Sequence, residues 1–232
     1  MDSGIRGLSA LFGSFRYGAV RRACNIGAVV MVAGCATADA DTITIAAFGD
    51  SLTQGYGLPA QQGFVPQLEE WLRANGADVT VVNAGVSGDT TAGGLSRVDW
   101  AITPETDAMI LELGANDFLR GIDPAVSREN LDGILSVADE AGLETLLVAI
   151  PASTNYGTEF KTQFDGMYVD LAEKYDVPLY PNFMEPLGEG ETVAGAAEQY
   201  LQSDGLHPTA EGVALIVEGI GPSVLELIEG LE

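Results

Sequence analysis

After residue 42 the apolar positions follow two periodicities in turn. Short apolar runs typical of buried strands occupy residues 43–48, 79–84, 108–113 and 144–150. Apolar residues at helical spacing, or residues typical of helix ends, predict helices over residues 64–72, 124–141, 159–175 and 213–228. Alternating strands and helices predict a single α/β domain, a three-layer αβα sandwich with helices on both faces of a mostly parallel, flavodoxin-like sheet.

Three of the predicted strands run into small or polar residues. Gly-Asp-Ser-Leu at 49–52 follows the first strand, Gly85 follows the second, and Gly-Ala-Asn-Asp at 114–117 follows the third. Ligands of an open parallel α/β sheet bind beyond the carboxyl ends of its strands. We therefore expect Ser51, Gly85 and Asn116 to gather on one rim.

Ser51 is a candidate nucleophile. A serine hydroxyl needs a base within hydrogen-bond reach, and the chain contains one histidine, His207. Asp204, three residues earlier, could accept the Nδ1 proton and orient the imidazole. Taken singly, each motif has a plainer interpretation, because a histidine beside proline is often a surface residue and Gly-Asp-Ser occurs by chance in turns.

An oxyanion hole would complete such a site. It needs donors about 2.7 to 3.1 Å from the developing oxyanion, and the backbone N–H groups of Ser51 and Gly85 with the side-chain amide of Asn116 would supply three. In the alternative interpretation Gly85 only makes a tight turn and Asn116 only caps a helix.

Four segments carry a resemblance to a known family. Residues 49–52, 83–90, 114–117 and 204–208 resemble the four blocks of the GDSL, or SGNH, hydrolases, and the likeness extends over roughly residues 43–229. Within that family the chain is most similar to the bacterial arylesterase branch, related to the periplasmic acyl-CoA thioesterase/lysophospholipase. The resemblance implies Ser51 as nucleophile, Asp204 and His207 as the other members of the triad, and Ser51, Gly85 and Asn116 as the oxyanion hole.

Two segments depart from the pattern of close relatives. Phe118 stands where a small residue is common, and Ala-Ile-Pro-Ala-Ser at 149–153 replaces a segment more often written with Met, Arg and Pro. Phe118 and Tyr156 are candidate contacts for the acyl or aryl group, with packing at the edge of the core as the alternative. The stretches 151–160 and 188–195 are candidate walls of the site.

Residues 1–40 differ from the rest of the chain. Four arginines precede an uncharged run from Ala23 to Cys35, which is shorter than the about 20 residues that cross a bilayer and is typical of a signal peptide. Cleavage before Cys35 would leave a lipidated cysteine and a membrane anchor, whereas cleavage after Ala38 or Ala40 would not. We expect residues 1–40 to be removed, leaving an exported, periplasmic domain at 41–232.

Composition excludes several partners. The 34 acidic and 10 basic residues give a formal net charge of −24, which excludes nucleic acid and favours neutral or zwitterionic substrates over anionic ones. The chain carries no metal-ligand cluster of histidines and cysteines and no Gly-x-x-x-x-Gly-Lys phosphate loop. We therefore expect neither a metal nor a cofactor.

These observations predict an exported serine hydrolase of esters. The alternatives are a non-catalytic binder of acylated ligands on the same fold, and a flavodoxin-like nucleotide-binding domain, which would leave the Ser-Asp-His set unexplained. Aryl esters, short-chain esters, thioesters and lysophospholipids remain open as substrates, because all are cleaved through the same tetrahedral chemistry.

Overall fold

Neighbouring strands in the central sheet are all parallel, in the order β2-β1-β3-β4-β5. The protein is represented by a computed structural model that describes residues 42–188 and 199–231, all within one unit that begins at Ala40. The strands are β1 (Ile43–Gly49), β2 (Val79–Gly85), β3 (Ala108–Glu112), β4 (Glu144–Val148) and β5 (Leu179–Tyr180).

The connections carry the helices. They are α1 (Ser51–Gln54), α2 (Phe64–Ala74), α3 (Thr91–Leu95), α4 (Val98–Ala101), α5 (Ala115–Leu119), α6 (Pro124–Glu140), α7 (Thr158–Tyr175) and α9 (Ala210–Glu229), with 3₁₀ turns η1 (Ala60–Gln62), η2 (Thr154–Tyr156) and η3 (Glu185–Leu187). Polar side chains cap the N-termini of several helices. Asp123 accepts the N–H of Ala125 before α6, and Thr209 accepts that of Gly212 before α9, which satisfies donors that lack an intrahelical partner.

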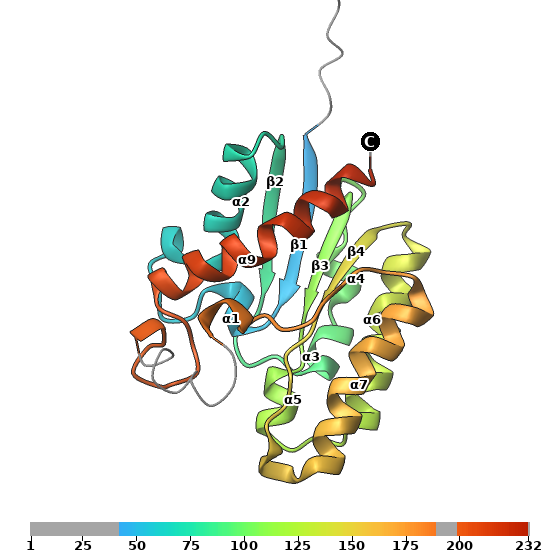
Figure 1. The fold of residues 1–232 in the computed structure, drawn as a ribbon. Coiled ribbons are helices and arrows are strands. Elements are labelled where there is room, and N and C mark those ends of the chain that lie inside the picture. Colours follow the sequence, from blue (N-terminus) through green and yellow to red (C-terminus); the bar gives the residue numbers. More distant parts are fainter. Residues whose placement is uncertain (1–41, 189–198, 232) are drawn as a thin grey trace, which may run out of the picture. The chain divides into compact units, whose positions relative to one another are not determined.

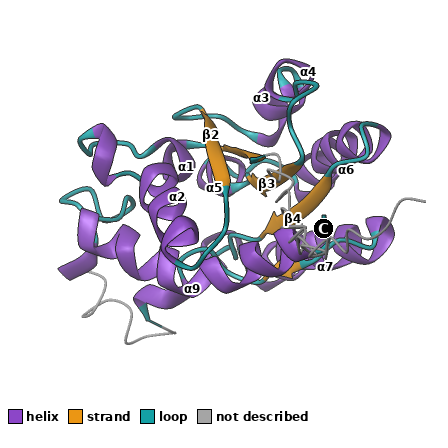
Figure 2. Ribbon diagram, turned by 90° about the horizontal axis from the view of Figure 1, so that it is seen from above, coloured by secondary structure: helices purple, strands orange, loops and turns teal. Residues whose placement is uncertain are grey.

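Both faces of the sheet are buried against helices. Because successive side chains of a strand point to opposite faces, Ile45 and Ala47 of β1 join a core with α2 and α9, while Phe48 joins a second core with α6 and α7. In Figure 1, α9 runs across the front of the sheet, and Figure 2 shows helices on both sides of the strands. The predicted three-layer α/β architecture with a parallel sheet is confirmed.

Strand register brings three loops to one level. Gly49 at the end of β1 is paired with Gly85 of β2 on one side and with Glu112 of β3 on the other. The segments that follow these residues therefore leave the sheet at a common rim, where the site is built.

Some short elements carry too little signal to be predicted from sequence. β5 has two residues, and α3, α4 and α5 have four or five each, so none spans enough residues to show a period of its own. Within the described residues, no helix combines the length and apolar character needed to cross a membrane.

Candidate active site

Ser51 is placed at the rim by the turn between β1 and α1. Asp50 caps the helix, accepting the N–H of Leu52 on Oδ1 at 3.0 Å. Ser51 is the first residue of α1, so its own N–H has no acceptor within the helix, and it has none elsewhere among the described residues. Ser51 thus carries both a hydroxyl group and a backbone N–H that has no acceptor among the described residues.

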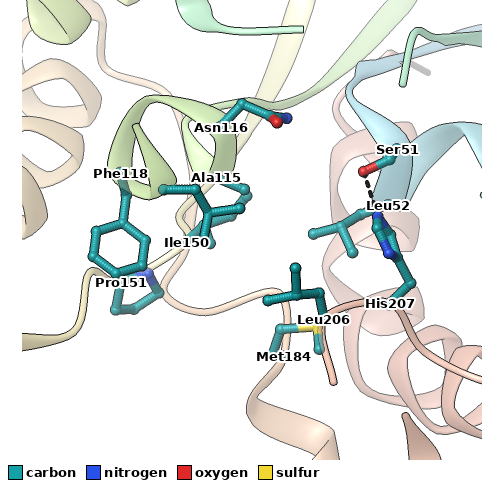
Figure 3. A pocket seen from close by; sticks show the side chains of 11 residues that line it. Ser51, Leu52, Ala115, Asn116, Phe118, Ile150, Pro151, Met184, Leu206 and His207 are labelled. Atoms are coloured by element: carbon teal, nitrogen blue, oxygen red, sulfur yellow. Dashed lines mark hydrogen bonds between the residues drawn. The ribbon is translucent and has the colours of Figure 1, made fainter. Parts of the chain in front are cut away.

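A chain of hydrogen bonds links three of the predicted site residues. Ser51 Oγ lies 2.8 Å from His207 Nε2, the bond drawn in Figure 3, and His207 Nδ1 lies 2.7 Å from Asp204 Oδ2. In the tautomer with its proton on Nδ1, the imidazole donates to the carboxylate and accepts from the serine hydroxyl. That arrangement allows His207 to take the proton of Ser51.

A tight loop holds the carboxylate against the imidazole. Asp204 Oδ1 accepts the backbone N–H groups of Leu206 and His207 at 2.9 and 3.1 Å, and Gly205, which follows Asp204, has a φ of +69°. The hydrogen bond from His207, followed by these two backbone bonds, lowers the pKa of Asp204 to about 2. Asp204 is therefore ionised at neutral pH.

Asn116 is held beside Ser51 by a buried carboxylate. Its Nδ2 donates to Asp50 Oδ2 at 3.0 Å, and the second hydrogen on Nδ2 has no acceptor among the described residues. Asn116 and Ser51 line the same cavity. The amide can therefore offer one donor to a ligand while the other fixes its orientation.

Gly85 lies at the predicted rim, but its N–H is not free for the oxyanion role predicted for it. Its N–H donates to Asn83 Oδ1 at 3.0 Å. A Cβ at Gly85 would overlap Gln54 N and lie 2.9 Å from the carbonyl oxygen of Asp50. The structure thus gives Gly85 a packing role against α1, because the donor that an oxyanion would need is already used.

Gly88, three residues further along in the turn that follows β2, has the feature that Gly85 lacks. Its φ is +85°, its carbonyl accepts Arg120 Nη2 at 2.8 Å, and its N–H has no partner among the described residues. The bond from Arg120 ties this turn to the end of α5, the helix that carries Asn116. Gly88 is therefore the better candidate for a backbone donor from this segment.

Two buried carboxyl groups lie behind the nucleophile. Glu112 Oε2 accepts Thr53 Oγ1 at 2.7 Å and the N–H of Asp50 at 3.4 Å, while Oε1 has no partner within the described residues. Complete burial, together with the charge of Asp50, raises the pKa of Glu112 well above its usual range. Burial likewise raises the pKa of Asp50 to about 6, although hydrogen bonds from Leu52 and Asn116 oppose the shift. Burial thus favours the neutral form of Glu112, whereas a pKa of about 6 leaves Asp50 mostly ionised at pH 7.

A mainly apolar cavity of about 160 Å³ opens beside Ser51 and His207 (Figure 3). Phe118 lines it and packs edge-on against Phe164 with ring centroids 6.3 Å apart. The whole lining consists of Ser51, Leu52, Ala115, Asn116, Phe118, Leu119, Ile150, Pro151, Met184, Leu206 and His207.

Tyr156 lies outside this lining. Its ring packs edge-on against Phe118 at 6.1 Å, and its hydroxyl donates to the carbonyl oxygen of Leu119 at 3.3 Å. Of the two aromatic residues predicted to contact substrate, the structure places only Phe118 on the cavity. Tyr156 contacts Phe118 and not the cavity.

Several predictions fall on residues outside the described part of the chain. They are the signal segment 1–40 with Cys35, and residues 189–195 of the glycine-rich wall. Among the described residues, no group of three or more His, Cys, Asp or Glu side chains could hold a metal ion.

Sequence reasoning missed Gly88, Glu112 and the orienting role of Asp50. The signal for Gly88 was present, because two glycines, Gly85 at the end of β2 and Gly88 in the turn that follows, lie close together in the sequence and only their hydrogen bonding distinguishes them. Glu112 ends an otherwise apolar strand, and a lone acid there was a clue to a buried polar contact.

The model of the GDSL-like lipase/acylhydrolase family matches residues 47–215 of this chain. The chain is 35% identical over 179 residues to an arylesterase of Vibrio mimicus, covering 77% of this chain and 86% of that protein. It is 34% identical over 192 residues to thioesterase 1/protease 1/lysophospholipase L1 of Escherichia coli K12, covering 82% and 86% respectively.

Among solved structures, the chain is similar to AlinE4, described as an SGNH-hydrolase family esterase. The two share 40% identity with a TM-score of 0.66, over 81% of this chain and 97% of that one.

Proposed function

The chain belongs to the GDSL-like lipase/acylhydrolase family, and we propose that it hydrolyses carboxylic esters through an acyl-enzyme on Ser51. The observation that carries the proposal is the continuous hydrogen-bond chain from Ser51 Oγ through His207 to Asp204, with distances of 2.8 and 2.7 Å. Ser51 and His207 of this chain line an apolar cavity suited to an acyl group.

Acylation follows from this geometry. Ser51 Oγ attacks the ester carbonyl carbon while its proton passes to His207 Nε2, and Asp204 stabilises the imidazolium that forms. The tetrahedral intermediate then collapses. The bond from carbon to the leaving oxygen breaks, and His207 returns the proton to that oxygen, which departs as an alcohol or phenol.

Deacylation repeats the steps with water. His207 takes a proton from a water molecule as its oxygen attacks the acyl carbon, and the bond to Ser51 Oγ breaks as that oxygen recovers the proton. The products are a free carboxylic acid and the original enzyme. No further reactant is needed.

The oxyanion in both intermediates needs fixed donors in a partly desolvated site. We assign this role to the N–H of Ser51 and to the second amide hydrogen of Asn116, neither of which has an acceptor among the described residues, with the N–H of Gly88 as a third donor in place of Gly85.

The cavity and the charge of the chain define the substrate class. Eight of the cavity-lining side chains are apolar, so an alkyl or aryl group is accommodated and a charged one is not. The formal net charge of −24 repels anionic substrates over about 8 to 10 Å at moderate salt. Neutral or zwitterionic esters are therefore proposed, in keeping with the names of the arylesterase and lysophospholipase relatives.

Purified protein assayed with chromogenic esters of increasing acyl length tests this function. Ser51→Ala and His207→Ala should each lower kcat by at least about 10⁴-fold, because nucleophile and base act as a unit. Activity of either variant near that of the wild type would exclude the mechanism. Retained binding of esters without any turnover of the wild type would support the non-catalytic alternative.

Export is proposed from residues 1–40 alone, whose arginines and uncharged run are typical of a signal peptide. Cell fractionation should find a shortened chain outside the cytoplasm, and a full-length cytoplasmic chain would contradict export. Lipid attachment at Cys35 predicts palmitate labelling that disappears in Cys35→Ser.

A further inference from the structure

Tyr56 covers one face of the His207 imidazole. The two ring centroids are 4.5 Å apart with an angle of 38° between the planes. Both nitrogens of His207 are already hydrogen-bonded, to Ser51 and Asp204. Those bonds lie near the ring plane, so they limit rotation within the plane better than tilting out of it. A side chain against the face limits the tilt.

The backbone of Tyr56 joins the nucleophile to the loop of the base. Its N–H donates to the carbonyl oxygen of Ser51 at 3.0 Å. Its carbonyl oxygen accepts Gln202 Nε2 at 2.8 Å, and the same amide nitrogen donates to the carbonyl of Pro208 at 2.9 Å. Gln202 also donates its backbone N–H to the carbonyl of His207 at 2.7 Å. Tyr56 therefore has a fixed position relative to both partners.

Close approach at this point depends on the next residue. Gly57 has a φ of +76°, and a Cβ there would overlap Gln202 Oε1. The glycine lets the chain pass against Gln202, which holds Tyr56 over the imidazole.

The contact is made by the ring and not by the hydroxyl. The Tyr56 hydroxyl has no hydrogen-bond partner within the described part of the chain, and Tyr56 is absent from the cavity lining. About half of the residue, 49%, is exposed. Its removal should consequently leave both the core and the acyl cavity unchanged.

We propose that Tyr56 is a positioning residue whose ring holds His207 in line between Ser51 and Asp204 during acyl transfer. The proposal rests on the function assigned above. The face of an aromatic ring also attracts cations, so the same contact favours the imidazolium that forms when Ser51 loses its proton.

Steady-state kinetics of two variants test the proposal. Tyr56→Leu keeps apolar bulk but removes the aromatic ring, and Tyr56→Phe keeps the ring but removes the hydroxyl. Because misplacing a reacting group by 1 Å can cost about 10²-fold, Tyr56→Leu should lower kcat by roughly tenfold, whereas KM should change little. Tyr56→Phe should retain the wild-type kcat. Trp100→Leu, at an aromatic residue that is 87% exposed and outside the cavity lining, is the matched surface control.

The single histidine of the chain provides a second measurement that does not depend on activity. In histidine-labelled protein, the ring protons of His207 should show a ring-current shift from Tyr56 in NMR spectra. The shift should persist in Tyr56→Phe and disappear in Tyr56→Leu.

The proposal would be overturned by an unchanged kcat in Tyr56→Leu, with or without a raised KM, or by an equal loss of kcat in Tyr56→Phe. An unshifted His207 proton in the wild type would also overturn it. None of these touches the proposed function, which fails if Ser51→Ala or His207→Ala stays active, or if the wild type turns over no ester.

Discussion

Asn116 and Asp50 are joined by a hydrogen bond of 3.0 Å from Nδ2 to Oδ2. One carboxylate thereby serves two elements, because the other oxygen of Asp50 caps α1 by accepting the N–H of Leu52. The residue before the nucleophile thus also orients the side chain proposed as an oxyanion donor. Orientation of that donor is set from the buried side of the site, where Asp50 has no exposed surface.

Asp50→Asn should lower kcat by about 10²-fold with little change in KM. The amide can still cap α1 through its oxygen, but its NH₂ group then faces the NH₂ of Asn116, and the donor turns away from the oxyanion. Loss of one such donor costs about 10² to 10³-fold. Steady-state kinetics on a soluble chromogenic ester measure the effect.

A double-mutant cycle provides the control. Asn116→Ala alone should cost about 10² to 10³-fold, and adding Asp50→Asn should cost nothing more, since residues acting through one contact are not additive. If the loss of kcat in the double variant equals the product of the two single losses, Asp50 acts on kcat by a route other than Asn116.

Glu112→Gln should change how stability depends on pH. The pKa of Glu112 is raised in the folded state, so folded protein keeps a proton that the unfolded chain loses above its ordinary pKa near 4.5. The wild type therefore loses stability as pH rises above that value, and the glutamine variant lacks this loss. Its free energy of unfolding should match that of the wild type near pH 4 and exceed it at pH 8.

Urea unfolding at several pH values tests this expectation. Asp204→Asn is the opposite control, because the pKa of Asp204 is lowered to about 2. In the wild type, the ionised carboxylate of Asp204 contributes stability that is present above pH 3.8 and is lost as the pH falls toward 2. A difference between wild type and Glu112→Gln that stays constant with pH would mean that Glu112 is ionised in the folded protein.

Phe118→Ala should lengthen the acyl chains that the enzyme accepts. Phe118 lines the cavity and packs against Phe160 and Phe164 of α7, so its removal should extend the apolar space toward that helix. The ratio of kcat/KM for long to short acyl esters should rise, while hydrolysis of phenyl acetate should fall because an aromatic contact is lost. Phe118→Leu, which keeps most of the volume, should change the ratio less. Parallel changes for all esters would mean that Phe118 only supports the Asn116 helix.

Gly85→Ala should destabilise the fold by about 1 to 3 kcal/mol, the usual cost of overpacking. The added Cβ would overlap Gln54 and crowd the carbonyl of Asp50. Gly166→Ala on α7 is the control, since a Cβ there meets no atom within 4 Å and should raise stability by about 0.5 to 1 kcal/mol. Unfolding curves compare the two. A Gly85→Ala variant with wild-type stability and a reduced kcat would return Gly85 to the oxyanion hole.

Much of the architecture was predictable from local pattern. The α/β alternation, the helix faces and the positions of four strands depend on residues close together in sequence, so periodicity and capping residues report them. The pairing of Ser51 with His207 was predictable for another reason: only one histidine is available to serve as the base.

Tertiary structure decided which backbone and side-chain groups remain free. Gly85 ends β2 and Gly88 lies in the turn that follows, and their glycine identity alone does not say which N–H is already bonded to Asn83. Similarly, the contact of Tyr56 with His207 and the burial of Glu112 depend on segments brought together only by the sheet and its loops. A sequence determines which groups a chain possesses, but hydrogen-bond direction and burial arise from distant neighbours, and these select the groups available to a substrate.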